Sequence, residues 1–232
     1  MQTMKWLNIS THAASVGPFA LLIWNYWHNQ MTVNPIQYLT FWTGKAALVL
    51  LVLTLACTPV NTLFGFRQVL ALRKPLGLYA FAYACLHLLT FVGLDYGFDI
   101  GLLEEAVLEK RYALAGFAAF LSLVPLAITS TRGWMKRLGK NWKRLHRLIY
   151  IAGLLAVVHF VWSVKSDIRE PLAYGTAVAF LLVFRLAKVR EALIKVRGRL
   201  GSSNRIRFLP AGNKPLCTND GAKEGRGELF RQ

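Results

Sequence analysis

The chain has 232 residues, of which 55% are hydrophobic, and its mean hydropathy is +0.39. Charged residues make up 17% of the chain and gather in a few short stretches, which is the pattern of a polytopic membrane protein and excludes a soluble domain with one core. The net charge of +17 does not indicate nucleic-acid binding, because basic stretches beside apolar helices follow the positive-inside rule and lie near anionic lipid.

Six segments are apolar and long enough to cross the roughly 30 Å hydrocarbon layer as helices. They are expected at about 9–28, 44–63, 76–95, 112–131, 147–164 and 171–188. The first is not a cleavable signal peptide, because it contains His12, Pro18 and Asn25 and lacks a clear small-residue cleavage site. We therefore predict an all-α membrane protein whose residues 1–197 form a six-helix transmembrane bundle.

The connections between these segments alternate in charge. The stretch 132–147 carries seven basic residues and no acid, whereas 95–111 carries five acidic residues against Lys110 and Arg111. A six-span arrangement places 23 of the 28 Lys and Arg on one side, which the positive-inside rule assigns to the cytoplasm. Both termini are therefore expected in the cytoplasm.

Residues 198–232 form a basic tail without a sustained apolar period, and this tail is expected to be disordered. We see no internal repeat of the transporter type, and the stretch 132–147 contains no phosphate loop or dinucleotide fingerprint. Electrons from a pyridine nucleotide would therefore need another protein, or electrons would arrive from the membrane as quinol.

The cysteines point away from covalent cofactors. Cys57, Cys85 and Cys217 form neither a CxxC nor a CxxCH motif, so c-type heme and an iron–sulfur cluster are not expected. A heme held by this chain would be bound non-covalently, through imidazole.

Two histidines lie deep in predicted spans, where an ionisable side chain is costly and is usually retained for binding or conduction. At 1.5 Å per residue, His87 and His159 are both roughly 17 to 18 Å from the cytoplasmic ends of their segments, in the outward half of the bilayer. Two neutral imidazoles at one depth suit six-coordinate heme iron, since the porphyrin supplies four nitrogens and the protein the two axial ones. The alternative is a hydrogen bond between helices.

A third histidine, His146, lies about 20 Å below His159 on the same segment, near the cytoplasmic boundary. It is either a further ligand, for a second heme or a flavin, or a solvated histidine at headgroup level. Thirteen residues before His87 stands Lys74, so His12, near the inner end of the first segment, is the only histidine that could meet His146. We expect His12 to be a packing residue.

Five short runs of residues stand out by their order and spacing. They are Arg73-Lys74-Pro75-Leu76-Gly77, Leu86-His87-Leu88, Thr129-Ser130-Thr131, Leu138-Gly139-Lys140-Asn141-Trp142-Lys143-Arg144-Leu145-His146 and His159-Phe160-Val161-Trp162-Ser163-Val164-Lys165. Together they resemble the MsrQ (YedZ) family of the ferric-reductase-like transmembrane group, over about residues 5–190. Proteins of the wider group carry two histidines on each of two helices, whereas this chain has one and two, so the number of hemes stays open.

The resemblance implies an electron-transfer subunit of the bacterial inner membrane that binds b-type heme and FMN. His87 and His159 are the candidate axial ligands of the heme iron, with His146 as a further candidate. Its electrons would come from the quinone pool or a cytoplasmic flavin reductase. They would pass to MsrP, a periplasmic molybdopterin enzyme that reduces methionine sulfoxide in oxidised proteins and carries the catalytic site. FMN follows from the resemblance alone, although the basic stretch 132–147 could hold its phosphate.

Two other functions fit the same pattern. One is a stand-alone ferric or flavin reductase of the same fold. The other is a transporter whose histidines relay protons. A visible spectrum separates the classes, because a transporter would show no Soret band.

Overall fold

The computed structural model describes residues 2–28, 30, 32–164, 167–185, 189 and 191. All regular structure in this part of the chain is helical, which confirms the predicted all-α class. These residues belong to one compact unit, Met1–Lys195. The basic tail predicted at 198–232 lies outside the described residues.

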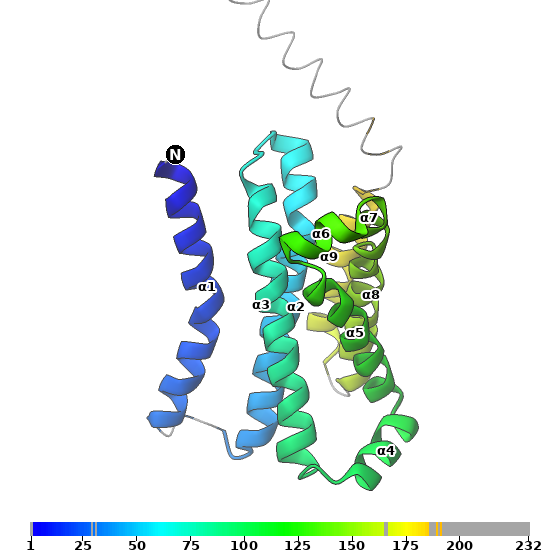
Figure 1. Cartoon of the computed structure of the whole chain (residues 1–232). Helices are drawn as coiled ribbons and strands as arrows, with labels where there is room; N and C mark the ends of the chain where they lie inside the picture. The colour runs from blue at the N-terminus through cyan, green and yellow to red at the C-terminus, as the bar shows by residue number, and fades with distance from the viewer. Residues whose placement is uncertain are drawn as a thin grey trace, which may run out of the picture. The chain divides into compact units, whose positions relative to one another are not determined.

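The long helices follow the predicted segments, and shorter helices connect them (Figure 1). The longer helices are α1 (Gln2–Trp27), α2 (Pro35–Phe64), α3 (Val69–Leu89), α5 (Arg111–Ile128), α8 (Leu148–Ser163) and α9 (Arg169–Val183). The shorter elements are η1 (Thr90–Asp95), a π-helical continuation of α3, and the helices α4 (Ile100–Glu109), α6 (Arg132–Leu138) and α7 (Lys140–Leu145).

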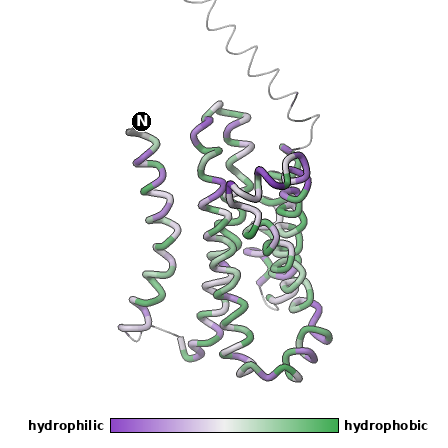
Figure 2. The backbone as a smooth tube through the Cα atoms, in the orientation of Figure 1, coloured by the Kyte–Doolittle hydropathy of each residue, from purple (hydrophilic) through white to green (hydrophobic). Residues whose placement is uncertain are grey.

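Within the described residues, four helical stretches are long and apolar enough to cross a membrane: Pro35–Phe64, Val69–Asp95, Arg111–Ile128 and Lys140–Ser163. Figure 2 shows hydrophobic residues along α2, α3 and α8, and hydrophilic residues around α6 and α7. The predicted first and sixth spans also form helices, α1 and α9, but these do not belong to the four. The sequence of α1 contains polar residues among the apolar ones, and α9, with 15 residues, is shorter than the 18 residues taken as the minimum for a span.

α2 begins at Pro35, earlier than the predicted start at 44, because Asn34 caps it. The Asn34 side chain accepts a hydrogen bond from the Gln37 N–H at 3.2 Å, and proline suits the first position of a helix. The helix ends at Phe64, where Gly65 takes a φ of 77° in the left-handed region that glycine adopts without strain. The predicted start was too late because the cap extends the helix beyond its apolar part.

α3 also begins earlier than predicted, at Val69 and not at 76. The sequence suggested a start after Pro75, but the helix continues through this proline. Pro75 has no N–H for the carbonyl of Ala71, four residues earlier, so that carbonyl is released from the helical pattern.

The helices pack as two antiparallel pairs, α2 with α3 and α5 with α8, and α9 lies against α8 and α2. A buried cluster joins α2 to α3; it consists of Ala46, Leu50, Leu51, Cys57, Leu72, Leu76, Ala80 and Tyr83. In Figure 1, α6 and α7 lie at one end of these pairs and α4 at the opposite end. Of the long apolar helices, α2 is the most buried in this arrangement.

Tyr83 attaches α1 to α3 by entering the hydrogen-bond ladder of α1. Its hydroxyl donates to the carbonyl oxygen of Ser15 at 2.8 Å and accepts from the N–H of Phe19 at 3.0 Å. Ser15 and Phe19 are four residues apart, so the hydroxyl contacts a carbonyl and an N–H that are partners in a regular helix. Pro18, next to Phe19, lies inside the same helix and lacks an N–H.

Arg185, just after α9, compensates for a proline in α2. Pro59 cannot donate a hydrogen bond to the Leu55 carbonyl, and the Arg185 guanidinium donates to that oxygen at 2.8 Å. The same guanidinium donates to the hydroxyl of Tyr150 at 2.9 Å and lies 5.0 Å from the centre of its ring. α9 is thereby joined to both α2 and α8.

α4 was not predicted as a separate element. The Asp99 side chain caps it by accepting from the Leu102 N–H at 3.1 Å. At its far end, the Lys110 ammonium donates to the Tyr96 hydroxyl at 2.8 Å, and this hydrogen bond raises the pKa of Lys110. The acidic connection between α3 and α5 is therefore partly helical, and the Lys110–Tyr96 hydrogen bond joins its two ends.

Candidate functional site

The structure brings His87 of α3 and His159 of α8 together. Their ring centroids are 5.9 Å apart and the ring planes are inclined by 77°. Both side chains are partly buried. The two imidazoles thus come from the two antiparallel helix pairs and meet between them.

Each of these imidazoles is held by a backbone carbonyl on the partner helix of its pair. Nδ1 of His87 lies 2.8 Å from the carbonyl oxygen of Thr40 in α2, and Nδ1 of His159 lies 2.6 Å from that of Tyr112 in α5. A carbonyl oxygen only accepts hydrogen bonds, so Nδ1 carries the hydrogen in both rings. Nε2 then keeps its lone pair, which is the state in which a neutral imidazole binds a metal.

Two glycines allow the rings to lie this close to the facing helices. A Cβ atom on Gly44 would lie 3.0 Å from Nδ1 and Cε1 of His87. A Cβ atom on Gly116 would lie 2.6 Å from Nδ1 of His159, closer than real Cβ atoms approach. Each glycine stands four residues after the carbonyl that binds the ring, so one helical turn supplies both the acceptor and the space.

The two halves of this arrangement are spaced identically in sequence. In each, the histidine follows the residue with the accepting carbonyl by 47 positions. Adding 72 to the residue number carries one half onto the other: Thr40 to Tyr112, Gly44 to Gly116, Ala80 to Ala152 and His87 to His159. Ala80 and Ala152 are 1% and 0% exposed. The helix pairs α2–α3 and α5–α8 therefore form an internal repeat that contributes one imidazole from each copy.

This donor set fits a heme. Metal–imidazole nitrogen bonds are about 2 Å long, so two axial imidazoles on opposite sides of one iron have ring centres about 6 Å apart, close to the observed spacing. The Nδ1–carbonyl bonds fix the orientation of each ring, as second-shell partners do in metal sites. The described residues contain no group of three or more His, Cys, Asp or Glu able to hold a metal ion.

Comparison with known families gives an independent result. Residues 43–157 match the family model described as "Ferric reductase like transmembrane component". The match includes Gly44, His87, Gly116 and His146, and it ends two residues before His159. It spans most of both copies of the repeat.

Three curated proteins show how far the similarity extends. A protein of Xanthomonas axonopodis pv. citri is 50% identical over 188 residues, which cover 78% of this chain and 86% of that protein. One from Xanthomonas campestris pv. campestris (strain 8004) is 48% identical over 77% of this chain and 85% of its own length. One from Herminiimonas arsenicoxydans is 42% identical over 82% and 89%. Each is named "Protein-methionine-sulfoxide reductase heme-binding subunit MsrQ".

This chain belongs to the MsrQ family. Identity at this level over most of both chains shows the same family and a multi-pass membrane protein of ferric-reductase type. No solved structure matches the chain significantly.

His146 of this MsrQ-family protein occupies a different environment from the other two. It ends α7, and its ring lies 4.0 Å from that of Trp142. Nε2 is 3.2 Å from the hydroxyl oxygen of Thr129, which itself donates to the carbonyl of Pro125 at 2.6 Å. The Thr129 oxygen therefore accepts from His146, and Nε2 carries the hydrogen. His146 is not brought to the His87–His159 pair.

His12 lies on α1 and contacts Tyr79 of α3. Its Nδ1 is 3.0 Å from the Tyr79 hydroxyl oxygen, and the two rings meet edge to face at 5.6 Å. Among the described residues, no hydrogen bond or ring contact joins His12 to His146. The partner that the sequence suggested for His146 is thus engaged elsewhere.

Sequence reasoning missed the residues that position the two central rings, namely Thr40, Gly44, Tyr112 and Gly116. A signal was present: the runs Gly44-Lys45-Ala46-Ala47 and Gly116-Phe117-Ala118-Ala119 recur at the 72-residue offset that relates the histidines. This repeat consists of continuous helices and differs from the transporter type, in which the helices are broken.

Proposed function

We propose that this protein is a membrane electron-transfer subunit that binds b-type heme through His87 and His159. The observation that carries the proposal is the pair of imidazoles 5.9 Å apart, each with Nδ1 bound to a carbonyl and Nε2 free. The name of the relatives, a heme-binding subunit of a methionine-sulfoxide reductase, supports it.

The residues of the site hold and orient; they do not make or break bonds in a substrate. When bound, the heme supplies an iron that accepts and releases one electron at a time. The carbonyls of Thr40 and Tyr112 keep both rings in the tautomer that binds iron. Gly44 and Gly116 let the rings lie against the backbone, where the surrounding apolar helices exclude water.

The direction of electron flow follows from the charge distribution. We take α1 and α9 as spans in addition to the four long apolar stretches, which gives six spans with both termini in the cytoplasm. The site then lies in the outward half of the bacterial inner membrane. Electrons from quinol or a cytoplasmic flavin reductase pass through it to a periplasmic acceptor, the molybdopterin reductase MsrP, which carries the catalytic site for methionine sulfoxide.

The proposal also includes a second cofactor site, FMN and the bounds of the heme domain. His146 is a candidate ligand for a second cofactor near the cytoplasmic side, and FMN rests on family resemblance alone. Residues 1–197 are taken as the heme domain, with the basic tail separate. A stand-alone ferric or flavin reductase and a proton-relaying transporter remain the competing functions.

A heme assay on the purified protein tests the proposal. We expect a Soret band with b-type α and β bands and, by pyridine hemochrome, at least one heme per chain. His87→Ala and His159→Ala should each lose most of this absorbance, because no other histidine lies at that level.

Near-normal heme in His159→Ala would refute the assignment of the ligands. A wild-type protein without a Soret band would favour the transporter. Reduction of MsrP by the heme-loaded protein separates the electron-transfer subunit from a stand-alone reductase, which would reduce ferric chelates without it.

A further inference from the structure

An open pocket that contains several polar side chains lies between α1 and α3, and neither central histidine lines it. Its volume is about 520 Å³. Residues of both helices line it: Asn8, His12, Ala71, Lys74, Pro75, Leu78, Tyr79 and Ala82. Asn8, His12 and Lys74 are exposed on the surface of the helical unit. The pocket is therefore open at the surface of the helical unit.

The side chains of the pocket can both donate and accept hydrogen bonds. His12 and Tyr79 are joined through Nδ1 and the hydroxyl at 3.0 Å. When Nδ1–H donates to the Tyr79 oxygen, Nε2 keeps a lone pair that can accept a proton, and the Tyr79 hydrogen is free to donate. The structure describes no hydrogen-bond partner for Lys74 or Asn8 within the residues it covers.

The backbone adds a further acceptor. Pro75 has no N–H for the carbonyl of Ala71, and both residues line the pocket. The pocket thus contains the His12 ring as a base, the Tyr79 hydroxyl, the Lys74 ammonium and the Ala71 carbonyl. Leu78 and Ala82 form an apolar wall beside them. Such a combination suits a ring that carries two oxygens and is otherwise apolar.

The pocket is close enough to the heme site to supply electrons. Tyr79 and His87 lie on the same helix eight residues apart, which is about 12 Å along its axis. The two are separated by Tyr83, one turn from each. This distance is shorter than the roughly 20 Å that separates the levels of His146 and His159.

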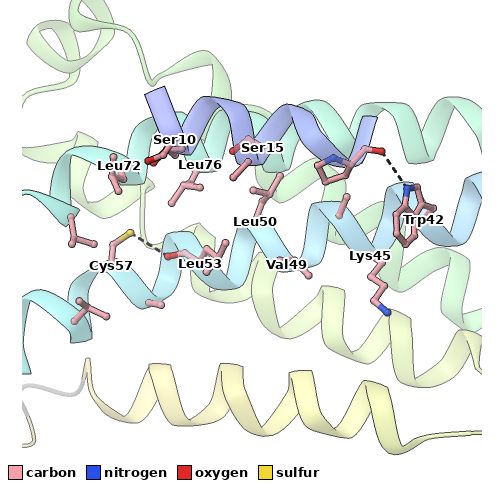
Figure 3. Close-up of a pocket in the computed structure, with 17 residues that line it drawn as sticks. Ser10, Ser15, Trp42, Lys45, Val49, Leu50, Leu53, Cys57, Leu72 and Leu76 are labelled. Atoms are coloured by element: carbon pink, nitrogen blue, oxygen red, sulfur yellow. Dashed lines mark hydrogen bonds between the residues drawn. The ribbon is translucent and has the colours of Figure 1, made fainter. Parts of the chain in front are cut away.

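A larger pocket of about 600 Å³ lies between α1, α2 and α3, but it is poorer in free polar groups (Figure 3). Trp42 in its wall donates to the carbonyl of Pro18 at 3.3 Å. Lys45 is paired with Glu170. The remaining lining is mostly apolar, so this pocket suits acyl chains and not the head of a polar ligand.

We propose that the pocket formed by Asn8, His12, Lys74 and Tyr79 binds the head of a membrane quinol and is where its electrons enter. The proposal rests on the proposed electron-transfer function, because the chain has no nucleotide motif and its electrons arrive through lipid or another protein. It locates the donor on α1 and α3, and it gives His12 a role other than packing.

The reaction at this pocket is the oxidation of one quinol to quinone. Two O–H bonds break, and the molecule releases two protons and two electrons. The electrons would leave one at a time for a ferric heme held by His87 and His159, and the periplasmic acceptor would reoxidise that heme between the two transfers. The protons pass in turn to Nε2 of His12 and then to water at the cytoplasmic surface. The Lys74 ammonium stabilises the negative charge that develops on the quinol oxygen.

Stopped-flow reduction of the heme-loaded protein in lipid nanodiscs by decylubiquinol tests the assignment. Tyr79→Phe and His12→Gln should lower the rate about tenfold, the effect of losing one hydrogen bond to the reacting group. Heme content and reduction by dithionite should stay unchanged. Binding of oxidised decylubiquinone, measured by equilibrium dialysis, should weaken by a similar factor in Lys74→Met, independently of electron transfer.

Tyr83→Phe is the matched control, because its hydroxyl also joins α3 to α1 but does not line the pocket. We expect its rate to stay within about twofold of wild type. If Tyr83→Phe slows heme reduction as much as Tyr79→Phe does, the effect comes from the attachment of α1 to α3. That result would overturn the assignment of the pocket as the quinol site. Unchanged rates in Tyr79→Phe and His12→Gln would overturn it too, as would a heme-containing wild type that decylubiquinol neither reduces nor binds. A wild type without heme would overturn the proposed function itself.

Discussion

The imidazole of His159 lies so close to Gly116 that a methyl group on this glycine would be 2.6 Å from Nδ1. The same nitrogen is 2.6 Å from the carbonyl oxygen of Tyr112, one turn earlier on α5. The backbone of α5 therefore determines where the ring lies and which nitrogen carries the hydrogen. The same holds for His87 on α2 through Thr40 and Gly44.

Gly116→Ala should displace the His159 ring and lower heme content as strongly as loss of the ligand. The added Cβ would overlap Nδ1, and both the ring and the backbone of α5 are held by packing, so neither can move freely. Gly44→Ala should have a weaker effect, because its contacts with His87 would be 3.0 Å. Absorbance in the Soret region per protein measures both.

Gly77→Ala, in the same helix pair as Gly44, provides the control. A Cβ there would lie 3.7 Å from the Thr54 methyl carbon, an ordinary contact, and helix propensity would favour alanine. We expect normal heme content in this variant. Normal heme in Gly116→Ala would show that the ring is not confined by α5.

Topology can be tested separately from the cofactor. A reporter that fluoresces only in the cytoplasm should be active when fused after Arg190. A reporter enzyme that works only in the periplasm should be active when inserted between Asp99 and Glu105, in the acidic connection. These outcomes follow from the distribution of Lys and Arg. The opposite pattern would invert the proposed electron path.

His146→Ala should leave the heme at His87 and His159 in place, since His146 has its own partners, Thr129 and Trp142. If His146 holds a second heme or positions a flavin, the variant should slow reduction of the outer heme by the cytoplasmic donor. Direct tunnelling over the roughly 20 Å between the levels of His146 and His159 is slow, so electrons that enter at His146 are expected to need a carrier at an intermediate depth. Donor-driven reduction, compared with dithionite, measures this.

Thr129→Val is the companion variant, because it removes only the hydroxyl that accepts from His146. It should reproduce part of the defect if the orientation of His146 matters. Should His146→Ala transfer electrons at the normal rate with unchanged cofactor content, the residue is a headgroup-level histidine.

Arg185→Met should destabilise the protein by about 1–3 kcal/mol, the cost of a buried acceptor without a partner. The acceptor is the Leu55 carbonyl, to which Pro59 cannot donate and Arg185 does. Thermal unfolding followed by circular dichroism in detergent should show a midpoint several degrees lower.

Pro59→Ala tests the cause. Alanine restores the N–H that the Leu55 carbonyl lacks, so the double variant should recover part of the stability lost in Arg185→Met. Additive losses in the double variant would indicate that Arg185 acts through Tyr150 or through its charge alone.

The sequence was sufficient to predict the membrane class, the all-helical fold, the approximate positions of the long helices, and that His87 and His159 lie at one level of the bundle. These properties depend on the length of an apolar segment and on the position of a residue along its helix. Both can be obtained by counting residues along the sequence. The same reasoning placed the starts of α2 and α3 too late. Asn34 caps α2 before its most apolar part, and α3 begins before Pro75 and continues through it.

Only the tertiary structure decided which atoms meet. The carbonyls of Thr40 and Tyr112, the space at Gly44 and Gly116 and the Tyr79 contact of His12 all depend on which faces of two helices lie together. Helix faces in a membrane are selected by close packing and by the pairing of released polar groups, and not by hydrophobicity, since the lipid is as apolar as the side chains. Periodicity along one helix therefore identifies the histidines, whereas their partners emerge only when the helices are packed.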